Sequence, residues 1–563
     1  MLRSACLCLG ILVFTWLGLQ VFPGHTYLQS DTQIYLPILE RLDEPGYLSR
    51  DLVAIRPHVS YTIYDEVALS LHRALRLDFE EVLVGQQILF RMLGFLGVYL
   101  FAAAAGLSRL EAFLVSALLH LGGALLGPAV LVVEYEPVPR AYALSLIFLS
   151  LGLFAQRLPL LASLAAALAF LYHPPTAAPF WAIVVLSYAF DRQVRPLARS
   201  TFVALVIAVL LLANLAQLQP GVVEQQRLFG RLSSSLAAIQ HIRTRYVWVS
   251  LWAGHDIWSY LALYTCSIWA TTRIWDSLNR SSRWFLAGLP TIGIASVPVS
   301  YILLEKLRLA IVPELQPARL LVFTVVSASL ACAIAGVQAA RERHRLQAFL
   351  WFLPVLAIPI KACVLDMFVL TNRPAVQLFA LWLALAASLT WLLSASGLRW
   401  RSPIRGTALA VPVLAIFLLP LAGVSNYPHL DKHPVEEVAR WAEANTWGSS
   451  VFLFPDSGHA LAPGMFRALC RRALWVDWKS GGQVNYFESL AQEWWSRWEA
   501  TMEGTFTAER LQGMLDLPID YYVLQRSNRL ASPKPVFENQ VYVVYDARDL
   551  KNSSTSLRKG TDD

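Results

Sequence analysis

Asp31 is the first residue of this chain whose type and position suit chemistry. It follows closely on a long apolar run, so it stands at the edge of the apolar phase that such a run requires. A carboxylate placed there can serve as a general base, or as a metal ligand for a substrate at that boundary. It can equally lie in the first turn of a helix, where negative charge favours the helix dipole without any chemical role. The sequence leaves both interpretations open.

A second group of charges lies in the stretch Glu134-Tyr135-Glu136-Pro137-Val138-Pro139-Arg140. Hard divalent cations such as Mg²⁺ or Mn²⁺ take carboxylate oxygens, which makes Glu134 and Glu136 candidate metal ligands. Arginine grips phosphate through paired hydrogen bonds, which makes Arg140 a candidate phosphate ligand. A short polar turn broken by two prolines is the alternative, and it explains the stretch equally well.

Three further polar turns contain His173, Arg319 (shortly after Glu314) and Asn372-Arg373. A histidine can bind phosphate or transfer a proton near neutral pH, although a lone histidine in a turn is more often structural. Each turn is a weak signal alone. Their value depends on whether the surrounding elements bring them to the same side of the molecule.

The composition indicates a membrane protein. Of the 563 residues, 56% are hydrophobic and 15% are charged, and the mean hydropathy is +0.49. A soluble domain carries roughly 25% charged residues, and a bilayer rejects charge at a cost of about 2.5–3.5 kcal/mol per residue at a helix centre. The net charge of +7 is spread in short clusters between apolar runs. It therefore predicts a lipid bilayer as partner and no nucleic acid.

Thirteen apolar runs are long enough to be spans or nearly so. The first, Ala5–Phe22, lacks a small-residue cleavage site at its exit and is expected to remain as an uncleaved helix. The other twelve lie at 86–106, 110–132, 141–156, 158–172, 177–190, 201–218, 257–272, 285–304, 319–340, 347–365, 374–394 and 406–424. The predicted fold class is mainly α: a polytopic transmembrane helix bundle followed by a small extracytoplasmic α/β domain.

Alternate connections between these runs are basic, which predicts the orientation of the chain. The basic residues of these connections are Arg109, Arg157, Arg192, Arg195, Arg199, Arg273, Arg280, Arg283, Arg341, Arg343, Arg345, Arg399, Arg401 and Arg405. The positive-inside rule then places the N-terminus in the cytoplasm and the C-terminus outside. The short tail and the lack of retention signals favour a bacterial inner (plasma) membrane.

The same orientation places all the polar turns, and a long first loop at 23–83, on the outer side. Within that loop, Ser30-Asp31-Thr32-Gln33 predicts a capping box with Ser30 as N-cap, and amphipathic stretches follow at 34–42 and 61–77. A further outer segment, 220–256, mixes arginines with apolar residues. These stretches predict helices that lie along the membrane surface.

The composition after about residue 426 becomes that of a soluble fold, which predicts a membrane domain at 1–426, an α/β domain at 427–550 and a polar tail at 551–563. Helices are expected at 434–446, 486–502 and 507–515, and strands at 450–454, 473–476, 521–524 and 541–545. Asp456, His459, Asp477 and Lys479 are expected on the solvated surface. The six cysteines have neither metal nor disulfide spacing, and a free thiol in an apolar run acts as a small hydrophobe.

This arrangement resembles the GT-C superfamily of membrane glycosyltransferases, which use polyprenyl-phosphate-linked sugars as donors. The stretch from Ser30 to Tyr35 is similar to their first-loop acidic signature, and Glu134-x-Glu136 to the acid-x-acid motif of their second outer loop. The C-terminal domain, with Glu493-Trp494-Trp495-Ser496-Arg497 among its motifs, resembles a bacterial group of membrane proteins with this topology. The chain departs from well-known members in lacking a paired Asp-Glu in the first loop.

The resemblance implies inverting sugar transfer on the outer face. Asp31 would act as the base, Glu134 and Glu136 would position a divalent ion or the lipid phosphate, and Arg140, His173 and Arg319 would stabilise the departing phosphate. Two alternatives stay open: a transporter, and a non-catalytic assembly protein that keeps the fold. No internal repeat and few central charges disfavour the transporter.

The sorting of arginines makes a testable prediction about topology. A tag at the C-terminus should react with an impermeant reagent applied to the outside of intact cells, because the last connection with basic residues is expected inside. A tag at the N-terminus should react only after permeabilisation. Reaction of the C-terminal tag from the cytosolic side alone would invert the predicted orientation.

Overall fold

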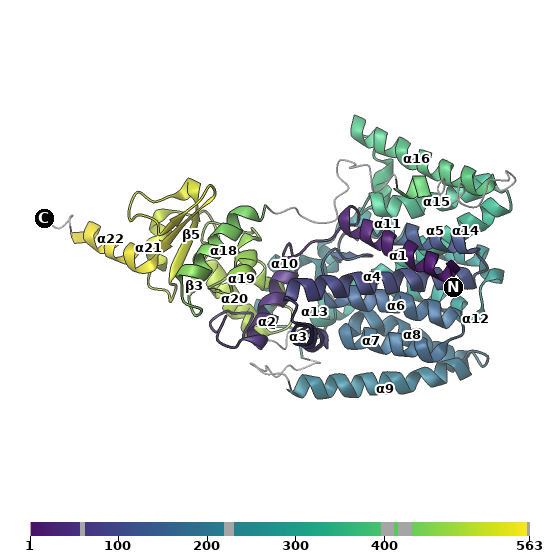
Figure 1. The fold of residues 1–563 in the computed structure, drawn as a ribbon, viewed down its shortest axis with the longest axis horizontal. Coiled ribbons are helices and arrows are strands. Elements are labelled where there is room, and N and C mark those ends of the chain that lie inside the picture. Colours follow the sequence, from purple (N-terminus) through teal and green to yellow (C-terminus); the bar gives the residue numbers. More distant parts are fainter. Residues whose placement is uncertain (1, 57–61, 219–229, 396–409, 415–430, 560–563) are drawn as a thin grey trace.

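The computed structural model of the chain describes residues 2–56, 62–218, 230–395, 410–414 and 431–559. It consists of a helix bundle and an α/β domain that follow one another along the long axis of the molecule (Figure 1). The helices that match predicted runs are α1 (Leu2–Gln20), α4 (Phe79–Ala104), α5 (Arg109–Leu119), α6 (Pro139–Ala155), α7 (Pro159–Tyr172), α8 (Pro174–Phe190), α9 (Arg195–Leu218), α11 (Gly254–Arg273), α12 (Arg280–Ser300), α14 (Leu321–Arg341), α15 (Arg345–Ile360) and α16 (Arg373–Ser394).

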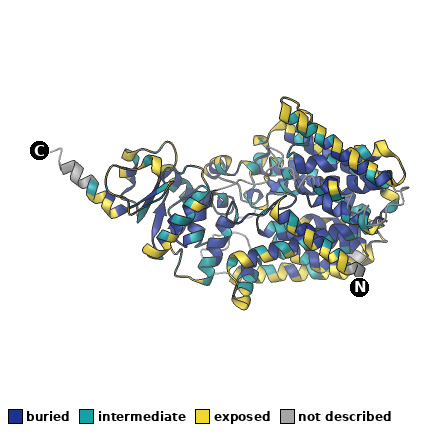
Figure 2. Ribbon diagram, turned by 45° about the horizontal axis from the view of Figure 1, so that its top comes forward, coloured by how far each residue is buried: buried dark blue, intermediate teal, exposed yellow. Residues whose placement is uncertain are grey.

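The chain is a multi-pass membrane protein. In the part of the chain that the structure describes, five helices are long and apolar enough to cross a membrane, and five shorter apolar helices accompany them. Exposed residues follow the outward faces of the bundle in Figure 2, and on α9 they are apolar: Val203, Val206, Ile207 and Leu210 are each more than half exposed. Apolar side chains turned outward are what lipid accepts and water does not. The thirteenth predicted run, 406–424, lies largely outside the described residues.

The prediction of one span over 110–132 was wrong in its second half. Helix α5 ends at Leu119, and a hairpin of β1 (Ala124–Leu125) and β2 (Val130–Leu131) follows. Gly122 and Gly127 have φ of +77° and +76°, a left-handed backbone that glycine adopts at little cost. Hydropathy averages over a window and does not detect a turn made by two glycines.

The bundle is packed closely enough for backbones to touch. A Cβ on Gly97 of α4 would lie 2.2 Å from the carbonyl oxygen of Phe148, and one on Gly152 would lie 2.1 Å from that of Gly97. Small residues permit this approach between α4 and α6, and dispersion over the contact favours it in lipid. Helix α6 begins at Pro139, so this contact fixes the helix that carries Arg140 in its first turn.

The connections predicted to be basic meet each other at one end of the bundle. Arg341 donates to the Gly106 carbonyl over 3.1 Å, the Arg280 Nε lies 2.5 Å from Asp191, and Arg273 pairs with Glu342. The connection with Arg399, Arg401 and Arg405 lies outside the described residues. The α/β domain lies at the opposite end of the bundle (Figure 1).

The α/β domain contains one mixed sheet of order β4-β3-β5-β7-β6. Its strands are β3 (Val451–Leu453), β4 (Ala473–Leu474), β5 (Tyr521–Gln525), β6 (Phe537–Glu538) and β7 (Tyr542–Asp546), and its helices are α18 (His433–Asn445), α19 (Ala462–Cys470), α20 (Glu488–Thr501), α21 (Ala508–Met514) and α22 (Ala547–Lys559). Strands β3, β4 and β5 are parallel, and the others pair antiparallel. The expected helices and strands are found, whereas α19, β6 and α22 were not predicted, and α22 extends into the stretch expected as a polar tail.

Three short helices lie between the bundle and the domain: α2 (Thr32–Asp43), α3 (Tyr64–Leu75) and α10 (Ser234–Arg243) (Figure 1). Helix α2 packs against α19, and α10 packs against α20. The stretches predicted as helices are therefore helical, and α2 and α10 are packed against the domain. Their apolar faces are covered by the domain.

Arg467 of α19 is the buried ion that joins the domain to the first loop. Its guanidinium lies 3.1 Å from Asp477 and 3.5 Å from Asp51, and it donates to the Gln33 carbonyl over 2.9 Å. Arg467 and both carboxylates are at most 1% exposed. Asp51 also accepts the Leu474 amide over 3.2 Å. Residues far apart in sequence therefore share one buried charge cluster.

Arg467→Ala should lower the free energy of unfolding of the domain by about 3–5 kcal/mol, because it leaves two buried carboxylates without their cation. Thermal unfolding of the detergent-purified protein measures the change. Arg526→Ala removes an exposed pair with Glu538 and is the matched control, with a nearly unchanged midpoint expected since solvent screens that pair. Equal midpoints for both variants would contradict the assigned role of Arg467.

Candidate functional site

Asp31 lies at the N-terminus of α2 and bonds to both parts of the molecule. Its Oδ2 accepts the Arg140 guanidinium over 2.7 Å, and its Oδ1 accepts the Lys479 ammonium over 2.6 Å. Arg140 belongs to the bundle and Lys479 to the domain. Burial alone would raise the pKa of Asp31, but the charges of Lys479 and Arg140 outweigh it and hold that pKa well below its ordinary value. Asp31 is therefore a carboxylate anion at neutral pH.

Glu134 holds Arg140 in place. Arg140 donates through Nε and Nη2 to the two Glu134 oxygens, over 2.6 and 3.2 Å, while its Nη1 serves Asp31. The backbone of Glu134 is fixed as well, because its carbonyl accepts the Arg91 guanidinium over 2.6 Å. A guanidinium bound along two edges is fixed in direction, so Arg140 presents one orientation to Asp31.

Glu136, the other acid of the predicted pair, performs a different task. Its side chain is 2% exposed and accepts the backbone amides of Gln29, Ser30 and Thr32 over 2.6–3.1 Å, together with the Thr32 hydroxyl. This carboxylate therefore shapes the turn that carries Asp31. The sequence predicted one shared role for Glu134 and Glu136, the positioning of a divalent ion or a phosphate. In the structure the two carboxylates accept from different donors.

These contacts do not fit the expected divalent-cation pair. Both oxygens of Glu134 accept from Arg140, and both oxygens of Glu136 accept from N–H or O–H donors. Lone pairs directed at donors are not available to a cation, and a guanidinium beside Glu134 repels one. We derive no step through a metal ion at these residues.

The predicted capping box was also wrong by one residue. Helix α2 begins at Thr32 with Asp31 as N-cap, and Asp31 makes no side-chain capping bond. Ser30 instead accepts the Lys479 ammonium at its hydroxyl over 2.9 Å. The carboxylate of Glu136 takes the Ser30 amide, which the Gln33 side chain would accept in that capping box, and the side chains of Ser30 and Asp31 face Lys479.

Asp477 and Lys479 are buried, contrary to the expectation of a solvated surface. Asp477 is 1% exposed and accepts the Ser480 amide over 3.2 Å, and Lys479 is 8% exposed. Arg243 of α10 donates to the carbonyls of Trp478 and Lys479 over 2.8 and 3.3 Å. Asp456 is half-buried and bonds to Asn528, and only His459 is exposed. Burial of Lys479 follows from docking of the domain, which a single segment does not reveal.

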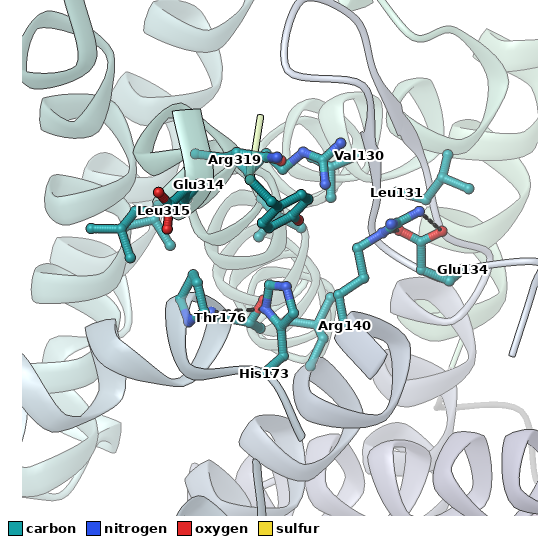
Figure 3. A pocket seen from close by; sticks show the side chains of 15 residues that line it. Val130, Leu131, Glu134, Arg140, His173, Thr176, Glu314, Leu315 and Arg319 are labelled. Carbon is teal, nitrogen blue, oxygen red and sulfur yellow. Dashed lines mark hydrogen bonds and ion pairs between the residues drawn. The ribbon is translucent and has the colours of Figure 1, made fainter. Parts of the chain in front are cut away.

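His173 and Arg319 line a pocket that also contains Arg140. In Figure 3, Arg140 reaches to Glu134, while the ring of His173 lies beside Thr176. The Thr176 amide donates to Nδ1 of His173 over 3.3 Å, so Nε2 carries the proton. Burial, with the charges of Arg140 and Arg319, lowers the pKa of His173 to about 3, and this turn residue is a neutral donor.

Arg319 is oriented by the hairpin and by an aromatic ring. Its Nε donates to the Pro128 carbonyl over 3.2 Å, and its guanidinium lies 4.7 Å from the centroid of the Tyr246 ring. Among the described residues, no carboxylate lies within ion-pair distance of Arg319. Asn372 and Arg373 do not join the site: Asn372 caps α16, and both are exposed.

One cavity of about 360 Å³ joins most of these side chains. Its charged lining consists of Asp31, Glu134, Arg140, Arg243, Arg319 and Lys479. A smaller pocket continues from it past Glu134, Arg140 and Arg319 to His173, with Leu144, Leu320 and Val322 on its walls (Figure 3). Four cations face two carboxylates in the main cavity, so its excess charge is positive and it suits an anionic ligand.

Sequence reasoning predicted Asp31, Glu134, Arg140, His173 and Arg319 as one group, and the structure brings these residues together around the two pockets. Sequence reasoning missed Lys479 and Arg243. It also missed the tyrosines that line the main cavity: Tyr35, Tyr135, Tyr246 and Tyr486. The only sequence signal for Lys479 was its place in Asp477-Trp478-Lys479, a short charged stretch beside apolar residues.

No protein-family model matches the chain, and no curated protein sequence does. Among solved structures, the chain is similar to ArnT from Cupriavidus metallidurans in the apo state, with 12% identity and a TM-score of 0.47 over 97% of this chain and 98% of that one. It is also similar to ArnT from the same organism bound to undecaprenyl phosphate, with 14% identity, a TM-score of 0.40 and the same coverage. The likeness is one of fold alone.

Glu136→Gln should destabilise the first-loop turn by about 1–3 kcal/mol, because an amide NH₂ group would face buried N–H donors. Limited proteolysis should then cleave between residues 26 and 32 faster than in the unmodified protein. Glu44→Gln, at an exposed position of the same loop, is the control and should leave the cleavage rate unchanged. Equal protection in the Glu136 variant would remove its assigned role.

Proposed function

We propose that this protein is a glycosyltransferase that moves a sugar from a polyprenyl-phosphate donor to an acceptor on the outer face of a bacterial inner membrane. One observation carries the proposal: Asp31 is bonded by Arg140 of the bundle and by Lys479 of the domain inside a single cavity. That pairing places a carboxylate among phosphate-binding cations.

The donor phosphate would occupy the cationic part of the cavity. Arg140 and Lys479 already bind an anion there, namely Asp31, and Arg319 has its guanidinium turned to the same space. The Nε2 proton of His173 supplies a neutral donor from the adjoining pocket. Charge-assisted hydrogen bonds of this kind stabilise a phosphate most when it becomes a leaving group.

The base would be Asp31, and the phosphate would activate it. In the structure the two cations lower the pKa of Asp31, which makes it a weak base. A bound phosphate competes for Arg140 and Lys479 and so raises the basicity of Asp31 where the acceptor arrives. Substrate binding and activation of the base are then a single event.

The reaction balances with these groups alone. Asp31 takes the proton of the acceptor hydroxyl, and the acceptor oxygen forms a bond to the anomeric carbon of the sugar. The bond from that carbon to the phosphate oxygen breaks, and polyprenyl phosphate leaves with its electron pair, held by Arg140, Lys479 and Arg319. Attack opposite the leaving group inverts the anomeric centre.

The lipid part of the donor needs an apolar path beside the phosphate site. Leu144, Leu320 and Val322 line the pocket next to Arg140 and belong to bundle helices or their ends. These walls suit the isoprenoid units nearest the phosphate, while the sugar and acceptor would occupy the polar cavity beneath the domain. The predicted outer position of the domain agrees with chemistry on that face.

The direct test is turnover of a labelled polyprenyl-phosphate sugar by purified protein. Asp31→Asn should reduce kcat by roughly 10²–10⁴-fold, as expected for loss of a general base, with donor binding retained. Asp43→Asn is the matched control: Asp43 is on the same helix but pairs with Arg73 outside the cavity, so full activity is expected.

Three results would separate the alternatives. Equal turnover by the Asp31 variant and the unmodified protein would remove Asp31 from the mechanism. If the unmodified protein binds the donor but transfers sugar to none of the acceptors tested, the non-catalytic assembly protein is favoured. Movement of the intact labelled lipid across proteoliposomes would favour the transporter.

A further inference from the structure

A second cluster of reactive side chains lies on the bundle outside the cavity. His255 and Asp256 belong to the first turn of α11, and Cys363 follows α15 just before the short helix η7 (Val364–Phe368). One ligand atom from each residue lies within 4.8 Å of the others. The segments are about a hundred residues apart in sequence, so their meeting is a result of the fold.

Asp256 gives this cluster an unsatisfied buried group. The residue is 4% exposed, and within the described part of the chain its buried Oδ1 has no hydrogen-bond partner. The Nε2 atom of His255 lies 3.6 Å from this oxygen, beyond hydrogen-bonding distance. A buried carboxylate oxygen without a donor is costly, and a cation would satisfy it.

The chemical types of the three ligand atoms indicate which metal ion the cluster would bind. Imidazole nitrogen, thiolate sulfur and carboxylate oxygen are together the ligands of zinc, whereas calcium and magnesium prefer oxygen alone. Cys363 is 1% exposed, and its thiol is near the Ser259 hydroxyl at 3.3 Å. His255 is exposed and offers a route for the ion. A fourth position remains for water.

We propose that His255, Asp256 and Cys363 bind one Zn²⁺ ion, which ties the start of α11 to the segment after α15. On binding, the Cys363 thiol releases its proton to solvent and the sulfur bonds to the metal. This site is separate from the proposed sugar transfer and holds whether or not that transfer occurs.

The position of the ion relates it to the cavity wall. Tyr260 of α11 donates to the Leu126 carbonyl of the hairpin over 2.7 Å. On its other side, the hairpin contacts α15: a Cβ on Gly123 would lie 2.6 Å from Ile358. The zinc therefore links the two helices that hold the hairpin, and residues Leu125 and Val130 of that hairpin line the main cavity.

Cobalt titration of the full-length protein tests the proposal. The protein is purified in detergent, stripped with chelator and titrated with Co²⁺ under reducing conditions. We expect one ion per chain, a thiolate-to-cobalt charge-transfer band, and loss of that band when Zn²⁺ is added. Cys363→Ser should abolish the band, whereas Cys332→Ser, which alters a buried thiol elsewhere in the bundle, should retain it.

A second pair of variants covers the case in which Cys363→Ser fails to fold. Asp256→Asn and His255→Gln should each weaken Co²⁺ binding by at least about 10-fold, since loss of even an outer ligand partner costs 10–100-fold. Elution volume and far-ultraviolet circular dichroism establish that each variant is folded. Absence of the band in the unmodified protein, or its persistence in a folded Cys363→Ser variant, would overturn the proposal.

Discussion

The bond network of Asp31 is the interaction on which the rest of the site depends. Its side chain is 26% exposed, and a carboxylate with limited access to water is costly without opposite charge; two cations from different parts of the chain supply that charge. Neither the bundle nor the domain contains the complete set. The cavity therefore exists as a charged site only when the first loop, the second loop and the domain are assembled around Asp31.

The two acids of the second loop illustrate how surroundings decide the role of a carboxylate. Glu134 and Glu136 are the same residue type two positions apart, yet one orients a guanidinium and the other satisfies three backbone amides. Glu134 orients the guanidinium next to Asp31, and Glu136 holds the backbone turn that carries Asp31. The spacing of the two acids suggested that they share a metal ion. Spacing does not show which N–H and O–H groups of the first loop donate to each carboxylate.

The sequence predicted what depends on local pattern and missed what depends on docking. Apolar runs predicted the bundle helices, and the polar turns between them predicted five of the site residues, since alternation along the chain sorts them to one end. Lys479 was assigned to the surface because its burial comes from α10 and the first loop, both distant in sequence. The hairpin after α5 was missed because hydropathy does not detect the backbone turns that Gly122 makes after the helix and Gly127 makes within the hairpin.

Two of the ionic contacts that join the domain to the first loop differ in what a ligand can do to them. Arg467 is fully buried between Asp51 and Asp477 and does not itself line the cavity, so a cavity ligand does not meet its guanidinium. Lys479 lines the cavity and binds Asp31, so an anion there competes directly. Because Arg467 anchors the domain independently, the proposed exchange of Asp31 for a phosphate at Lys479 would not release the domain. The structural contact and the proposed substrate contact would then lie in one interface.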